Sequence, residues 1–251
     1  MVDTRFDGPI GQLRLTRPEK LNALDRESLE GIAAAAGEFN RRPDVKVVIV
    51  SGEGPSFCAG FDLSDPSWTS DGPYERSAAV GRSMAEALDS MTAITIASIR
   101  GHCIGGGVVL AAACDLRVAS TTAQFRIPEA DLGVPLYWTG VPRLVRELGP
   151  ALTKELILTT RAFDAAEART IRFVNHVVDE AELESSTLQL AQEIAARPAL
   201  VLRVTKEQVD RAAPPVEPGA HDPDLDVAEF GAALADPECR EVAARYSRGP
   251  R

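Results

Sequence analysis

Residues Thr95–Cys114, with the sequence TIASIRGHCIGGGVVLAAAC, decide the fold. The pattern predicts a buried strand, then a turn containing three consecutive glycines, then an apolar helix over Val108–Cys114. Glycines at a strand-to-helix turn expose backbone N–H groups, and the helix dipole adds positive potential there. Such a turn suits an anion or a developing oxyanion, but it also fits a tight turn or close packing of a helix on a sheet.

Strands and helices alternate on both sides of this stretch, which predicts βαβ units and a mainly parallel sheet. Apolar residues at helical spacing between Leu29 and Phe39 predict one helix, with Asp25 as its N-cap. Beyond about Glu180 only helices are predicted. The other predicted strands are Gly11–Leu15, Lys46–Val50, Leu116–Ala119 and Val174–Val178; the predicted loops are Ser64–Ser77, a candidate lid, and Ala213–Asp226.

Composition narrows the possible partners. The 251 residues carry a formal net charge of −10, which argues against binding to nucleic acid or to an anionic membrane. The longest stretch without charged or bulky polar residues, Cys103–Cys114, is too short for a membrane span of about 20 residues. The N-terminus lacks the pattern of a secretory signal, and the four cysteines are not spaced as a disulfide framework. We therefore expect a cytoplasmic protein with reduced thiols.

Motif spacing excludes several enzyme classes. The chain has no dinucleotide-binding GxGxxG, no P-loop, no GxSxG elbow and no HExxH, and its three histidines are not at metal-ligand spacing, so no metal site is expected. A carboxyl group remains as a candidate: Glu129 follows Pro128 in an apolar segment, where a raised pKa would suit general acid–base catalysis. Alone, Glu129 would fit a surface or helix-capping role better than a catalytic one.

Together these segments resemble the crotonase superfamily, also called the enoyl-CoA hydratase/isomerase family. The matching stretches, in chain order, are LTRPEKLNAL (residues 15–24), FCAGFDL (57–63), IRGHCIGGG through ACDLRVAS (99–120), AQFRIPEADLG (123–133) and TKE (205–207). The resemblance implies an α/β fold, a crotonase-type spiral of repeated ββα units with a helical C-terminal trimerisation region. Residues 1–195 would form the catalytic core and residues 196–251 the helical oligomerisation region.

The resemblance also implies an acyl-CoA thioester as substrate, with CoA as part of the substrate and no separate cofactor, and a homotrimer or a dimer of trimers. The backbone N–H groups of Phe61 and Gly106 would form an oxyanion hole, with Glu129 as the catalytic acid/base. The implied CoA-binding residues are Lys20, Leu21, Ala59, Asp62, Leu63 and Lys206; Lys20 or Lys206 would supply a cation for the CoA phosphates.

The sequence departs from the family pattern at two places. Hydratases of the family carry a second catalytic glutamate two residues past the third glycine, where this chain has Val109. The usual glycine-rich run after the acidic segment is replaced by residues that include Tyr137 and Trp138, which either shape the acyl pocket together with Val109 or serve packing. One carboxyl group can shuttle a proton between C2 and C4 more readily than it can both activate water and protonate C2. The sequence therefore favours double-bond isomerisation over hydration.

Two other hypotheses remain at this stage. The chain could be a non-catalytic or weakly active acyl-CoA-binding protein that has lost one acid. It could also catalyse another enolate reaction, such as decarboxylation or C–C cleavage, because one fold hosts many chemistries.

Overall fold

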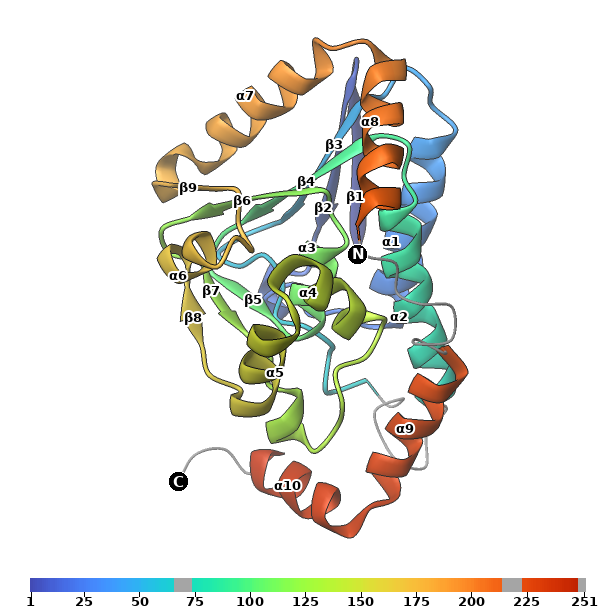
Figure 1. Cartoon of the computed structure of the whole chain (residues 1–251), viewed down its shortest axis with the longest axis vertical. Helices are drawn as coiled ribbons and strands as arrows, with labels where there is room; N and C mark the ends of the chain where they lie inside the picture. The colour runs from blue at the N-terminus through green and yellow to red at the C-terminus, as the bar shows by residue number, and fades with distance from the viewer. Residues whose placement is uncertain (66–73, 214–222, 248–251) are drawn as a thin grey trace.

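A six-stranded sheet forms the centre of the protein in a computed structural model, which describes residues 1–65, 74–213 and 223–247 (Figure 1). The strand order is β1-β2-β3-β4-β6-β9, in which β1 is antiparallel to β2 and the other neighbours are parallel. The bounds are β1 (Val2–Asp7), β2 (Ile10–Leu15), β3 (Val47–Gly52), β4 (Ile94–Ile99), β6 (Leu116–Ser120) and β9 (His176–Val178). The predicted parallel sheet is confirmed.

A second sheet of three short strands continues from the first. It has the order β5-β7-β8, with β5 (His102–Ile104), β7 (Gln124–Arg126) and β8 (Phe163–Asp164). The chain passes from β4 into β5 and from β6 into β7, so successive turns place one strand in each sheet. This is the expected ββα spiral, and it brings the segments that follow β3, β4 and β6 to the same end of the large sheet.

The helices cover both faces of the large sheet. They are α1 (Arg26–Asn40), α2 (Tyr74–Asp89), α3 (Gly106–Ala112), α4 (Gly140–Leu148), α5 (Pro150–Thr159), α6 (Ala165–Thr170), α7 (Leu183–Ala195), α8 (Ala199–Ala212), α9 (Pro223–Ala235) and α10 (Pro237–Ser247), with short 3-10 turns η1 (Pro18–Lys20), η3 (Glu129–Leu132) and η4 (Glu180–Glu182). Asp25 caps α1 as predicted, since its carboxylate accepts a hydrogen bond from the Ser28 N–H at 2.9 Å.

Strand β3 is buried on both faces, which explains its continuous run of β-branched residues. Val48 and Val50 lie in the main core with α1, α2 and α3, whereas Val47 and Ile49 lie in a second core beneath α7. Helix α7 contacts β2, β3, β4 and β6, and Figure 1 shows it along one side of the large sheet. Helix α7 ends at Ala195, and the division into a catalytic core of residues 1–195 and an oligomerisation region of residues 196–251 stays a prediction.

The C-terminal helices α8, α9 and α10 lie in two separate places on the molecule. Helix α8 lies beside the large sheet, whereas α9 and α10 lie at the opposite end of the molecule, where α10 packs against η3 (Figure 1).

Both loops were predicted too long. Residues 66–73 and 214–222 lie outside the described residues, but residues 74–77 begin α2 and residues 223–226 begin α9. Pro223 at the start of α9 is compatible with a helical first turn, which composition alone did not reveal.

Candidate active site

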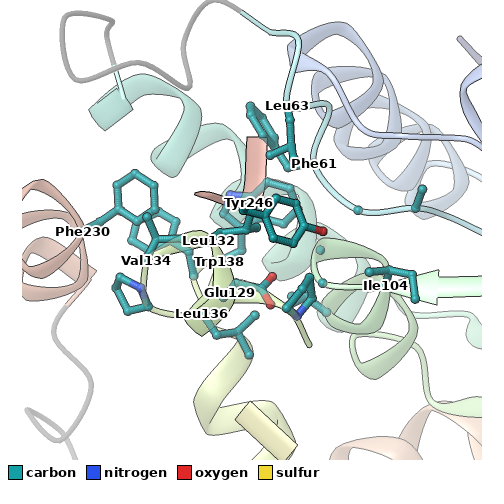
Figure 2. A pocket seen from close by; sticks show the side chains of 18 residues that line it. Phe61, Leu63, Ile104, Glu129, Leu132, Val134, Leu136, Trp138, Phe230 and Tyr246 are labelled. Carbon is teal, nitrogen blue, oxygen red and sulfur yellow. The ribbon is translucent and has the colours of Figure 1, made fainter. Parts of the chain in front are cut away.

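A cavity of about 110 Å³ opens where two glycine-bearing turns, the first at residues 56–62 after β3 and the second at residues 101–107 after β4, meet η3 and the helices α9 and α10 (Figure 2). The lining residues belong to three segments, Ala59–Leu63, Ile104–Val109 and Pro128–Trp138, of which most but not all residues face the cavity. Phe230 and Tyr246 complete the lining. The lining is mainly apolar with few polar groups, which is typical of a small-molecule site. The structure therefore brings together segments that are far apart in the sequence.

The second glycine turn presents backbone N–H groups to this cavity. Gly105 has φ +50 and precedes α3, and its own N–H donates to the Arg126 carbonyl oxygen at 2.9 Å. Gly106 and Gly107 are the first two residues of α3, so their N–H groups have no acceptor within the helix. The arrangement can stabilise negative charge at the helix N-terminus, as the sequence suggested.

The first turn lies against the second. A Cβ added to Gly60, which has φ +90, would stand 3.3 Å from the Gly106 nitrogen. Leu24 hydrogen-bonds to the Gly60 carbonyl and to the Asp62 N–H, so the intervening Phe61 N–H points to the other side of this segment. The two backbone amides predicted for an oxyanion hole are thus on adjoining turns that line one cavity.

Glu129 begins η3 and reaches the same turns. A Cβ on Gly105 would lie 2.6 Å from Glu129 Oε1, so glycine is needed there for the carboxyl group to approach. The Oε2 atom is buried without a hydrogen-bond partner in the protein. Burial raises the pKa of Glu129 from 4.5 to about 7, partly offset by its own backbone N–H. Among the described lining residues, no other side chain carries a carboxyl group.

Two contacts hold the turn that carries Glu129. The Arg126 guanidinium donates to the Thr160 carbonyl at 2.8 Å and to Asp131 Oδ2 at 2.5 Å. Thr160 Oγ1 donates to the same Asp131 oxygen at 2.7 Å. Arg126 therefore positions both halves of the site, since its carbonyl oxygen holds Gly105 and its side chain holds η3.

The three residues predicted for the acyl pocket all line the cavity. Val109 is fully buried on α3, one turn after the glycines. Tyr137 pairs with Phe230 at a ring-centroid distance of 5.2 Å. Trp138 is buried, and its ring lies edge-on to Phe61 at 6.0 Å. Tyr137 and Trp138 therefore shape the pocket and serve packing at the same time.

The predicted CoA-binding residues of the N-terminal half lie together, though not all in the cavity. Ala59 and Leu63 line it, and the Ala59 N–H donates to the Leu21 carbonyl at 2.9 Å. Lys20 is exposed beside Leu21. Asp62 instead faces inward, where its carboxylate accepts a hydrogen bond from a guanidinium N–H of Arg17 at 2.9 Å. Asp62 thus has a structural role in fixing the first turn.

Lys206 lies outside this site. Its ammonium donates to Asp115 Oδ2 at 2.9 Å, at the start of β6, and its side chain is buried there. Asp115 also bonds to Thr95 at the beginning of β4, whereas the cavity lies beyond the end of that strand, about 20 Å away along its length. Within one chain, Lys206 anchors α8 and does not reach the cavity.

Phe230 and Tyr246 were missed by the sequence reasoning. They line the cavity from α9 and α10, which the sequence assigned to oligomerisation. A Cβ on Gly133 would stand 2.3 Å from the Cys239 carbonyl oxygen, so α10 packs directly on the turn after η3. An aromatic residue in each of α9 and α10 was the available signal, but the sequence does not show which element those residues contact.

Cysteines and metal-type clusters contribute nothing to the cavity lining. Cys58, Cys103 and Cys114 are buried free thiols whose pKa values burial raises, to about 12 for Cys58 and Cys114. Within the described residues, no three His, Cys, Asp or Glu side chains are close enough to hold a metal ion. No helix in that part of the chain is long and apolar enough to cross a membrane.

Comparisons with known proteins agree with this geometry. The sequence profile of the enoyl-CoA hydratase/isomerase family matches residues 5–246. A short-chain-enoyl-CoA hydratase from Clostridium acetobutylicum is 31% identical over 206 residues, covering 82% of this chain and 79% of the relative. A peroxisomal Δ(3,5)-Δ(2,4)-dienoyl-CoA isomerase from Arabidopsis thaliana is 35% identical over 219 residues, with the same coverage of 82% and 79%.

A solved structure extends the likeness to the fold. A Thermobifida fusca protein assigned as an enoyl-CoA hydratase, crystallised in complex with CoA, superposes with a TM-score of 0.77 at 31% identity, over 97% of this chain and 94% of that chain. The matched relatives include both a hydratase and an isomerase, so they fix the family and not the reaction. The chain belongs to the enoyl-CoA hydratase/isomerase family and has the crotonase fold.

Proposed function

We propose that the protein isomerises the double bond of 3-enoyl-CoA thioesters through a thioester enolate, with Glu129 as its sole acid/base. The observation that carries the proposal is the buried Glu129 carboxyl group, whose Oε2 has no partner in the protein, beside helix-terminal amides in an otherwise apolar cavity. A CoA complex of the Thermobifida fusca relative supports a CoA thioester as the substrate.

The reaction needs one base and one anion site. The thioester oxygen accepts hydrogen bonds from the Phe61 and Gly106 N–H groups, and the Glu129 carboxylate removes a proton from C2. The negative charge spreads over the thioester oxygen and C4, and the two amides stabilise the part that lies on the oxygen. Losing one such donor typically costs about 2.7–4 kcal/mol. Protonated Glu129 then returns the proton to C4, and the double bond moves to C2–C3. Every proton that leaves the substrate is restored to it.

The environment of Glu129 suits both steps. With a pKa of about 7, the group is half ionised near neutral pH, so neither its acid nor its base form is scarce. The apolar walls exclude water, which strengthens the electrostatic effect of the amides on the enolate. Hydration would require a second group to orient water, and the position suited to it carries Val109.

The assembly is part of the proposal. Helix α8 exposes Leu200, Val201 and Val209, which supports association through this helix into a homotrimer or a dimer of trimers. Light scattering of the purified protein would measure the mass: about 80 kDa would fit a trimer of the 26.8 kDa chain, and a monomer would contradict this part of the proposal.

The test is a panel of 2-enoyl-, 3-enoyl- and 3-hydroxyacyl-CoA esters assayed with the wild type, Glu129→Gln and Val109→Glu. The wild type should turn over the 3-enoyl ester faster than it hydrates the 2-enoyl ester. Glu129→Gln should lose about 10³-fold or more in kcat while still binding CoA esters. Val109→Glu, checked for folding by thermal unfolding, should raise the ratio of hydration to isomerisation. Faster hydration than isomerisation by the wild type, or unchanged turnover by Glu129→Gln, would contradict the proposal.

A further inference from the structure

Trp138 lies between helices α2 and α3 and forms part of the cavity wall. Its ring lies so close to α3 that a Cβ on Gly106 would stand 2.3 Å from Cζ3. On its other edge it lies against α2, where a Cβ on Gly81 would stand 2.0 Å from Nε1. The indole fits only because both neighbours are glycines.

Gly81 has no other evident role. It lies inside α2, where a glycine is about 1 kcal/mol less favourable than alanine, and it has no positive φ that would require glycine. Its φ and position would allow alanine were it not for the indole. The helix therefore carries an unfavourable residue at the one place where the Trp138 ring presses on it.

The backbone at Trp138 is also held in an unfavourable conformation. Trp138 and Thr139 have φ values of +60 and +57, a conformation that costs a non-glycine residue free energy. The Arg143 guanidinium donates to the Thr139 carbonyl at 3.1 Å and to its hydroxyl group, and so holds this turn from α4. The indole is thus fixed from its backbone as well as from its ring, and it does not swing aside as a free surface tryptophan could.

The space left in front of the indole is small. The cavity of about 110 Å³ is about three quarters of the ~150 Å³ of an apolar cavity that takes up benzene, a molecule of six carbon atoms. Leu136 and Phe230 close further sides of the cavity, and Figure 2 shows the Trp138 side chain among the labelled wall residues near Glu129. The cavity therefore has room for about four carbon atoms.

From this geometry we infer that Trp138 is the specificity-determining residue that closes the acyl pocket and restricts the protein to short-chain acyl-CoA thioesters, with Gly81 as the residue that seats it. The inference rests on the proposed function for the class of ligand, a CoA thioester, but not for the reaction. A longer chain meets the indole face, which the two glycines and the left-handed backbone keep in place.

Binding of saturated acyl-CoAs tests the inference without any turnover. We expect the wild type to bind butyryl-CoA at least about tenfold more tightly than decanoyl-CoA, since even one misfitting methylene in an apolar pocket changes discrimination by about 10-fold or more. Trp138→Leu should bring the two dissociation constants within about threefold of each other by admitting the longer chain. Equal binding of both esters by the wild type, or an equal change of both in Trp138→Leu, would overturn the inference.

A second pair of variants tests the seat of the indole and does not touch the ligand. Gly81→Ala places a methyl group inside the indole and should push the ring into the cavity, weakening butyryl-CoA binding about tenfold. Gly37→Ala is the matched control, because it is also inside a helix but a Cβ there would stand 3.8 Å from the end of the Arg41 side chain, an ordinary contact distance. In the Trp138→Leu background, Gly81→Ala should lose its effect.

These outcomes separate the inference from the proposed function. If butyryl-CoA binds with the expected selectivity but no 3-enoyl ester is isomerised, the proposed reaction fails and the pocket assignment stands. If isomerisation occurs but Gly81→Ala binds butyryl-CoA as the wild type does, the assigned roles of Trp138 and Gly81 are overturned. Thermal unfolding of each variant, compared with Gly37→Ala, confirms that folded protein is being measured.

Discussion

Replacing Glu129 by glutamine should make the stability of the protein less dependent on pH. The Glu129 carboxyl group has its pKa raised from 4.5 to about 7 by burial, so the folded state favours the protonated form. This group therefore contributes stability that is fully present below pH 4.5 and is lost as the pH rises through 7. At 1.36 kcal/mol per pKa unit, the full loss is about 3 kcal/mol. Glutamine has nearly the same shape and does not ionise.

The assay is urea unfolding of the wild type and Glu129→Gln at a fixed protein concentration and at several pH values from 4.5 to 8.5. The difference in free energy of unfolding should move by about 3 kcal/mol in favour of the variant over this range, with most of the change below pH 7. Any fixed cost of the buried amide shifts every point equally and leaves the pH dependence intact. A difference that stays constant within about 0.5 kcal/mol would refute the reasoning that burial disfavours the ionised carboxylate.

Further predictions follow from the same contacts. The kcat/KM for a 3-enoyl-CoA should rise with pH and level off above about 7 as Glu129 ionises; a flat profile from pH 5.5 to 8 would argue against it as the base. Arg126→Ala should lower kcat about 10- to 100-fold with little change in KM because the catalytic turn loses its clamp, whereas Arg161→Ala, which removes surface ion pairs, should not; equal effects in steady-state kinetics would count against a positioning role. Asp62→Ala should lower the free energy of unfolding by about 1.5–3 kcal/mol by removing one of the two carboxylates, Asp25 and Asp62, that pair with the buried Arg17 guanidinium, against less than about 1 kcal/mol for Asp3→Ala in an exposed pair, as chemical denaturation can measure.

Local patterns predicted much of the fold and the reactive half of the site. The glycine turn before α3 and the proline before Glu129 are short-range signals, and parallel strands bring the ends that follow them together. Strand β1 was not predicted, because Val2–Asp7 alternates with charged residues and is stabilised by pairing with β2 rather than by burial on both faces.

Long-range packing explains what the sequence could not predict. Lys206 has the charge expected of a phosphate ligand, but its partner depends on where α8 lies. In that position its ammonium group donates a hydrogen bond to Asp115. Phe230 and Tyr246 reach the cavity only because α9 and α10 fold back over η3. The requirement for glycine at position 81 becomes visible only when the Trp138 ring is in place.

The central claim is that Glu129 removes an α-proton while adjacent amides stabilise the enolate. The most direct measurement is transfer of label from a 3-enoyl-CoA dideuterated at C2, turned over in ordinary water and followed by deuterium NMR for the wild type and Glu129→Gln at equal concentrations. We predict deuterium at C4 of the product with the wild type, and transfer at the background rate with the variant. Transfer by Glu129→Gln at the wild-type rate would contradict the account.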